Sequence, residues 1–295
     1  MKQPSTETEK IIAAMWDYND PAATEARFLA WLDSTGAEQP LQDRLMVRTQ
    51  IARTYSLRGN FDEAHATLDD IENEITSGMI AVRVHYDLER GRAFNSAGEA
   101  DKAVPLFIDA WEVAGKAGLE RPAIDAAHML GIAAPPELQL DWNLKALAMV
   151  EESSDSAVKG WLGPMYNNIG WTYHDSGEFE SALDYFRKGY AWRIEVDDAP
   201  GARIAKWTVG RVLRSLDRLD EALTLQIELE QESKDAGQPV DGFNCEELGE
   251  LYLALEQPDM AVRYFRQAHE ILSQDQWLVA NESDRLARLK ELGGE

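Results

Sequence analysis

Residues Gly170 to Ala182 read "GWTYHDSGEFESA", a phrase that has a small residue at each end and a glycine near its middle. Close relatives of this phrase occupy Ala52 to Ala64 ("ARTYSLRGNFDEA") and Gly91 to Ala103 ("GRAFNSAGEADKA"). Weaker or degenerate copies begin at Gly131, Gly210 and Gly249. In chain order the six starting residues are separated by 39, 40, 39, 40 and 39 positions, so one structural unit is repeated six times.

Each phrase fits a hairpin of two helices. The opening Gly or Ala lies on the first helix and the closing alanine on the second, where small residues let antiparallel helices approach closely. A central glycine such as Gly177 marks the turn, because glycine accepts a left-handed backbone; Asp217 and Glu256 replace it in the last two copies. A bulky residue four positions after the closing alanine, such as Phe186, is expected to fill the contact with the next repeat.

The phrase resembles the tetratricopeptide repeat (TPR), with a period of 39–40 residues in place of the usual length of about 34. Kinesin light chains and bacterial peptide-pheromone receptors also use long-period repeats, and the chain is similar to that broad class. HEAT-type repeats have a suitable length but lack the small-residue phrase. The resemblance implies an all-α fold, a right-handed α-α superhelix (TPR-like solenoid) of about six to seven helical hairpins plus a C-terminal capping helix.

The whole chain is accounted for as a single solenoid domain over residues 1–295. Within it we expect a degenerate N-terminal helix pair over 5–35, six repeats over 45–274 and a capping helix over 276–292. Repeat three departs from the pattern. Pro135 and Pro136 must end its first helix early, because the residue before a proline avoids the helical region. Asn143 takes the place of the closing alanine.

The composition narrows the function classes. The chain has 53 Asp and Glu against 29 Lys and Arg, a formal net charge of -24, so it repels nucleic-acid phosphates and anionic lipids. Cys245 is the single cysteine, so no internal disulfide is expected. The start of the chain, Met1 to Lys10, has no apolar segment typical of a leader, and no stretch approaches the roughly 20 apolar residues that span a bilayer. We expect a cytoplasmic protein with no nucleic-acid or membrane partner.

In TPR arrays the first helices line an inner, concave groove, and the resemblance assigns five positions of each first helix to that surface. In this acidic chain those positions hold four arginines, three histidines and two tryptophans. The residues predicted to line a ligand- or peptide-binding groove are Gln50, Arg53, Arg92, His128, Asn167, Asn168, Trp171, His174, Trp207, Arg211 and Arg214. Amides can bond to an extended peptide, arginine to a carboxylate, and tryptophan supplies apolar contact area.

A second interpretation of these positions stays open. The arginines would simply pair with Glu89 or with acids of the second helices, and the tryptophans would belong to the core. In the last repeat Glu246, Glu247 and Glu250 occupy the same inner positions. A ligand lying along the groove would therefore meet a positive middle and a negative C-terminal end.

Known catalytic patterns are absent from the sequence. It has no phosphate-binding glycine loop, no G-x-S-x-G elbow, no H-E-x-x-H and no Cys/His spacing typical of a metal site. His174 and Asp175 are neighbours on a helix and do not face each other. We predict no enzyme activity, no catalytic residues, no metal and no cofactor. The Lys/Asn/Lys/Arg arrangement of the carboxylate-clamp TPR subtype is also missing.

Three functions are compatible with this sequence. The first is a non-catalytic protein- or peptide-binding scaffold or adaptor that uses the concave groove, with a protein or peptide carrying acidic groups as its partner. The second is a regulatory sensor that responds to a ligand or signalling peptide and acts on a separate partner. The third is a structural subunit of a homo- or hetero-oligomer, which would use the convex face or the end helix.

Overall fold

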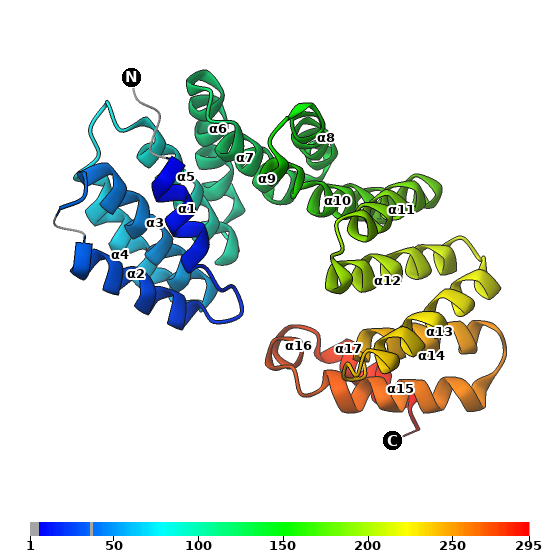
Figure 1. Cartoon of the computed structure of the whole chain (residues 1–295). Coiled ribbons are helices and arrows are strands. Elements are labelled where there is room, and N and C mark those ends of the chain that lie inside the picture. Colours follow the sequence, from blue (N-terminus) through cyan, green and yellow to red (C-terminus); the bar gives the residue numbers. More distant parts are fainter. Residues whose placement is uncertain (1–5, 36–37, 295) are drawn as a thin grey trace. The chain divides into compact units, whose positions relative to one another are not determined.

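The computed structural model describes residues 6–35 and 38–294, and none of these lies in a β-strand (Figure 1). The helices are α1 to α17 in chain order. They form two compact units, Met1–Lys159 and Gly160–Glu295, which are described in turn. Ser5, with which the predicted N-terminal pair begins, is outside the described residues. The single domain expected over 1–295 stays a prediction.

Unit 1 is built from four helical hairpins, α1/α2, α3/α4, α5/α6 and α7/α8, followed by the short α9. Its first helices α3, α5 and α7 contact one another in order, as stacked repeats require. The bounds are α1 (Thr6–Met15), α2 (Pro21–Thr35), α3 (Leu41–Leu57), α4 (Phe61–Glu72), α5 (Ile80–Ser96), α6 (Ala100–Ala117), α7 (Glu120–Ala133), α8 (Pro136–Glu152) and α9 (Ser156–Lys159).

Unit 2 contains three hairpins, α10/α11, α12/α13 and α14/α15, and two short closing helices. Its first helices α10, α12 and α14 also contact one another in order, and α17 packs on α15. The bounds are α10 (Leu162–Asp175), α11 (Phe179–Glu195), α12 (Ala199–Ser215), α13 (Leu219–Asp235), α14 (Gly242–Ala254), α15 (Pro258–Leu272), α16 (Gln276–Asn281) and α17 (Ser283–Leu292).

The hairpin turns have the left-handed backbone that the sequence predicts. Gly59, Gly98 and Gly177 have φ angles of 75°, 79° and 80°. Asp217 and Glu256 adopt φ angles of 59° and 57° at the equivalent places, although neither is glycine. A left-handed backbone at a residue with a side chain costs about 1 kcal/mol, so these two turns reduce the stability of the last two repeats by about that amount each.

The opening glycine of a repeat makes room for an aromatic ring. A Cβ atom built on Gly91 would lie 2.5 Å from the ring of Phe107, and one on Gly249 would lie 2.8 Å from the ring of Phe265. Both rings are almost completely buried. The bulky residue thus packs over the glycine of its own hairpin, a contact that the sequence-based explanation omitted. Phe107 also shares a buried cluster with residues of α7, the first helix of the next repeat.

Repeat three has a shortened first helix, as its prolines predict. Helix α7 ends at Ala133, two positions after Gly131, whereas α10 continues to Asp175, five positions after Gly170. Ala134 is extended, with φ −67° and ψ 161°, and α8 begins directly after Pro135.

The predicted capping helix over 276–292 is divided into α16 and α17. Glu282 separates them with φ −129° and ψ 40°, outside the helical region. Asp275 starts α16 by accepting hydrogen bonds from two backbone N–H groups of its first turn. Leu278 on α16 and Leu289 on α17 are buried in the same cluster, so both short helices still cover the apolar end of unit 2.

Candidate functional site

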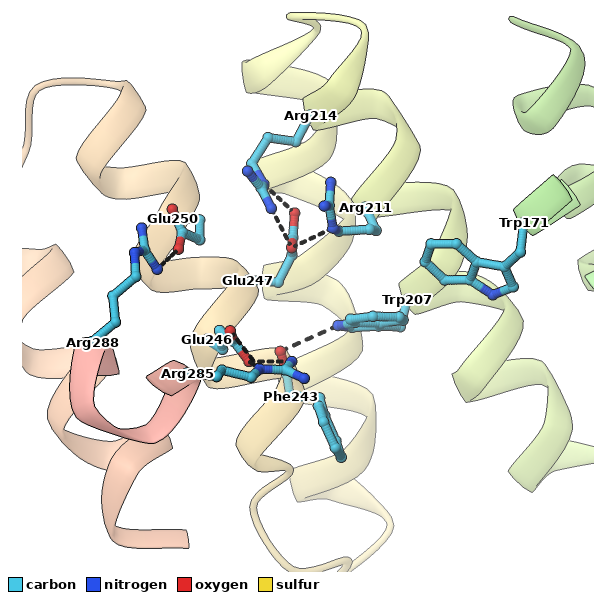
Figure 2. A pocket seen from close by; sticks show the side chains of 10 residues that line it. All are labelled: Trp171, Trp207, Arg211, Arg214, Phe243, Glu246, Glu247, Glu250, Arg285 and Arg288. Atoms are coloured by element: carbon cyan, nitrogen blue, oxygen red, sulfur yellow. Dashed lines mark hydrogen bonds and ion pairs between the residues drawn. The ribbon is translucent and has the colours of Figure 1, made fainter. Parts of the chain in front are cut away.

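The first helices of unit 2 and its last helix surround a pocket of about 570 Å³ (Figure 2). Ten residues line it: Trp171 from α10; Trp207, Arg211 and Arg214 from α12; Phe243, Glu246, Glu247 and Glu250 from α14; and Arg285 and Arg288 from α17. Four arginines face three glutamates here, so the pocket carries one excess positive charge in a chain whose formal net charge is -24.

Aromatic side chains from three successive first helices form one wall of the pocket. The ring centroids of Trp171 and Trp207 are 6.3 Å apart, and those of Trp207 and Phe243 are 6.5 Å apart. The indole N–H of Trp207 donates to the backbone carbonyl of Phe243 at 3.2 Å, which fixes the ring between α12 and α14. Trp171 is supported from behind by the ring of Phe186, with centroids at 5.2 Å. This wall offers apolar area for a ligand.

Glu247 lies between two arginines of α12 (Figure 2). Arg214 grips it with two hydrogen bonds, Nε to Oε1 at 2.5 Å and Nη2 to Oε2 at 3.0 Å. The Nε of Arg211 is 3.6 Å from Oε2 of the same carboxylate. The Glu247 side chain is 3% exposed, and this burial raises its pKa although the hydrogen bonds from Arg214 oppose the shift.

The pKa values of the two α12 arginines shift in opposite directions. Burial lowers the pKa of Arg211, and the positive charge of Arg214 lowers it further. Burial also lowers the pKa of Arg214, but its hydrogen bonds with Glu247 and the negative charges of the three pocket glutamates together outweigh burial and raise the pKa. Arg211 is therefore the less well compensated of the two charges.

Helix α17 contributes two arginines to the opposite side of the pocket. Arg285 donates to both carboxylate oxygens of Glu246, at 2.6 to 3.1 Å, and to Glu282 at 2.8 Å. Arg288 forms an ion pair with Glu250. Neither arginine belongs to the repeats, so the repeat positions of the sequence did not predict them. The signal was present, since they follow Glu246 and Glu250 by 39 and 38 positions, about one repeat.

Four of the predicted groove residues line this pocket, namely Trp171, Trp207, Arg211 and Arg214. The three acidic residues expected to face the same way, Glu246, Glu247 and Glu250, line it as well. Phe243 was missed, although it occupies the second groove position of repeat six and could have been found by extending the same column.

His174, Asn167 and Asn168 lie on α10 but do not line the pocket. The Nε2 atom of His174 is 3.0 Å from Ser215 Oγ, which also accepts from Arg211 Nη1 at 2.9 Å. Burial lowers the pKa of His174, and the charge of Arg211 adds to the effect, so the neutral imidazole is favoured at pH 7. His174 thus joins the edge of the arginine cluster, while a role for the two asparagines stays a prediction.

The predicted groove residues of unit 1 are bonded to side chains of their own unit. Glu89, which is 2% exposed, lies 3.4 Å from Arg53 and accepts from Arg92 at 2.6 Å. Arg92 also pairs with Asp125. The side-chain amide of Gln50 donates to Glu89 at 3.4 Å. For Arg53 and Arg92, pairing with an acid of a neighbouring repeat is thus what the structure shows.

The turn between α1 and α2 covers part of this network. Trp16 donates its indole N–H to the side-chain oxygen of Gln50 at 3.0 Å. The guanidinium carbon of Arg53 lies 5.7 Å from the ring centroid of Trp16 and 5.5 Å from that of Tyr18, within the range of cation–π contacts. Nearby on α7, burial lowers the pKa of His128 to about 4. In unit 1, Gln50, Arg53 and Arg92 are therefore bonded to other side chains of the same unit.

Two segments of the chain match family models described as the tetratricopeptide repeat, residues 163–193 and 245–276. The first covers the hairpin α10/α11 and the second the hairpin α14/α15, on either side of the pocket-lining helix α12. Together with the stacked hairpins of both units, these matches make the chain a tetratricopeptide-repeat protein with an all-α fold of the α-α superhelix class.

Solved structures with the same fold include RapI in its apo form, which is 14% identical with a TM-score of 0.67, over 92% of this chain and 76% of that one. A STAND protein with a tetratricopeptide repeat sensor from Pyrococcus horikoshii is 14% identical with a TM-score of 0.69; the match spans 96% of this chain but only 46% of that protein. NprR in complex with its cognate peptide NprX is 13% identical with a TM-score of 0.60, over 97% and 82% of the two chains. Identities this low show a shared fold alone.

A search of curated proteins found no match to this chain. In the ranges 6–35 and 38–294, no group of three or more His, Cys, Asp or Glu side chains is placed to hold a metal ion. No helix within those ranges is both long enough and apolar enough to cross a bilayer.

Proposed function

We propose that the protein is a non-catalytic binding module that takes a peptide, or an exposed segment of a partner protein, in the pocket of unit 2. The observation that carries this proposal is the row Trp171, Trp207 and Phe243 beside the arginines of α12. Tryptophan and arginine are the side chains most often responsible for affinity at protein interfaces. The volume of about 570 Å³ suits a few side chains of an extended segment.

The fold supports the same proposal. NprR, which shares this fold, was solved with its cognate peptide, and that complex is the precedent for peptide binding by such a solenoid. A partner that carries an acidic group fits the excess positive charge of the pocket. The absence of nucleic-acid and membrane partners, of a cofactor and of catalysis, and the cytoplasmic location, remain part of the proposal as predicted from the sequence.

A regulatory sensor is the second candidate, and the P. horikoshii protein, whose repeats are described as a sensor, is the observation in its favour. The third candidate, an oligomer subunit, would use α16, where Trp277 is 62% exposed. One experiment can therefore separate a contact in the pocket from a contact through the end helix.

The test is a selection of peptides from a random dodecapeptide display library on the immobilised full chain. Recovered sequences are synthesised with blocked ends, and their dissociation constants are measured by fluorescence anisotropy. Trp207→Ala should weaken binding about 10-fold or more, because it removes the central ring of the wall. Trp277→Ala, a tryptophan of unit 2 outside the pocket, should leave binding unchanged.

Each variant must first match the wild type in helicity and melting temperature. Recovery of no binding peptide, or equal affinity for wild type and Trp207→Ala, would contradict peptide binding in the pocket. Loss of binding with Trp277→Ala alone would instead favour a contact through the end helix.

A further inference from the structure

Three of the four pocket arginines have carboxylates hydrogen-bonded to them. Arg214 holds both oxygens of Glu247, Arg285 holds those of Glu246, and Arg288 pairs with Glu250. Within the part of the chain that the structure describes, Arg211 has no hydrogen bond to a carboxylate. Its Nη1 donates to the hydroxyl of Ser215 at 2.9 Å, and its nearest acid is the 3.6 Å contact with Glu247, a group already gripped by Arg214.

The surroundings of Arg211 make this incomplete pairing costly. Its side chain is 28% exposed and lies beside the charge of Arg214. A partly buried cation gains most from an anion that reaches its free N–H groups, because hydrogen bonds to charged groups are stronger than neutral ones. An incoming carboxylate that bonds to Arg211 need not displace Glu247 from its two hydrogen bonds with Arg214.

The neighbours of Arg211 restrict what accompanies that carboxylate. Trp207 and Trp171 line the same pocket (Figure 2), and they favour an aromatic or large apolar group. Glu246, Glu247 and Glu250 line it as well. A second negative charge on the ligand, or a phosphate with its charge of about −1.5 to −2, would be repelled by these three carboxylates.

We propose that Arg211 is the anion-binding residue of this pocket and that it selects a segment with one carboxylate next to an aromatic or large apolar side chain. This inference rests on the proposed function and specifies its ligand. A site for phosphopeptides or for strongly acidic tails would differ from this pocket, because it would require several arginines or lysines that are not paired with carboxylates.

The experiment starts from the best dodecapeptide of the selection described above. Its acidic position is synthesised in four forms, as the original acid, as the matching amide, as phosphoserine, and as the acid with two further aspartates beside it. Dissociation constants are measured for wild type, Arg211→Gln and Arg218→Gln. Arg218 is the matched control, because it lies outside the pocket, in the turn that caps the start of α13, and pairs with Glu221 near the surface.

On wild type the amide peptide should bind about 10- to 100-fold more weakly than the acid, the range for one hydrogen-bonded charge. Phosphoserine and the multiply acidic peptide should also bind more weakly than the single acid. Arg211→Gln should lose the same factor for the acid peptide and show no further loss for the amide, which is the signature of a direct pair. Arg218→Gln should behave as wild type.

Failure of this inference differs from failure of the proposed function. If selected peptides lose affinity with Trp207→Ala but contain no acid, or bind Arg211→Gln as well as wild type, the pocket binds peptides and Arg211 does not read their charge. Tighter binding of the phosphoserine or multiply acidic peptide would also overturn the inference. If no peptide binds at all, both proposals fall together.

Discussion

The side-chain amide of Asn143 donates a hydrogen bond of 3.1 Å to the backbone carbonyl of Gly131. In an uninterrupted helix this carbonyl would accept from the N–H of residue 135, but residue 135 is a proline and has no N–H. Asn143 is completely buried, so its amide reaches the carbonyl where water does not compete. The residue that breaks the repeat pattern therefore supplies the donor that Pro135 removes.

The second proline of repeat three is compensated in the same way. Pro136 cannot donate to the carbonyl of Ile132, and the side chain of Gln139 donates there at 3.2 Å and to the carbonyl of Ala134 at 2.9 Å. A buried backbone carbonyl without a donor is costly, which explains the amide at Asn143; the hydrogen bond from Gln139 to Ile132 is exposed, so water can replace it there.

We predict that Asn143→Ala, which restores the usual repeat residue, destabilises the protein by about 1–3 kcal/mol, because it leaves the Gly131 carbonyl without this donor. The reverse change in repeat four, Ala182→Asn, should also be destabilising, since the Gly170 carbonyl is already served within α10 and Ala182 is completely buried. Urea unfolding followed by circular dichroism measures both. A neutral or stabilising Asn143→Ala would show that the hydrogen bond does not matter.

The contact between Gly91 and Phe107 gives a second prediction about stability. A methyl group on Gly91 would lie 2.5 Å from the buried ring, so Gly91→Ala should cost about 1–3 kcal/mol despite the better helix propensity of alanine. Gly115→Ala, in an open and exposed position of α6, should instead stabilise by about 0.5–1 kcal/mol.

A double variant decides whether the ring is the cause. Gly91→Ala should be less costly in a Phe107→Leu background than in the wild type, because the branched side chain is smaller and can move away. Equal costs in both backgrounds, measured by urea unfolding, would point to a clash elsewhere in the crossing of α5 and α6.

The hairpins could be predicted from sequence because they depend on local features that recur. Gly59, Gly98 and Gly177 indicate left-handed turns. Asp217 and Glu256 adopt the same turn geometry, so the repeat structure is kept where glycine is replaced. What the sequence did not reveal was which side chain fills the space above each opening glycine, since that depends on packing across the hairpin.

The candidate site was partly predictable for a similar reason. Aligned columns placed Trp171, Trp207 and Arg211 on neighbouring first helices, where the structure brings them into one pocket. The aligned repeat positions could not show which arginines already form ion pairs within the protein. Arg53 and Arg211 occupy equivalent positions and each has a glutamate 36 residues later. Within the described residues, however, only Arg53 of the two has its guanidinium within cation–π distance of aromatic rings.

The third prediction concerns the pH dependence of stability and His128. Burial lowers the pKa of this imidazole to about 4 in the folded protein, and the attraction of Asp125 offsets only part of the effect. In the unfolded chain the pKa is near the ordinary value of about 6.5. Between these two values the unfolded state binds more protons, so the free energy of unfolding must decrease as the pH falls through this window.

The variant His128→Gln removes this titration and keeps a polar side chain of similar size. Its free energy of unfolding should fall less than that of wild type between pH 7.5 and pH 5, by about 1–2 kcal/mol, a value reduced for partial solvent screening. Urea unfolding at several pH values measures the difference, and the other histidines cancel because both proteins contain them. At pH 7.5, where His128 is neutral in both states, the two pH curves should run parallel.

A carbon-detected titration of the imidazole in the folded protein gives an independent check, because His128 should keep the chemical shifts of the neutral ring down to about pH 5. Protonation of His128 near pH 6.5, or identical pH slopes for the two proteins, would show that the folded protein stabilises the imidazolium as well as water does.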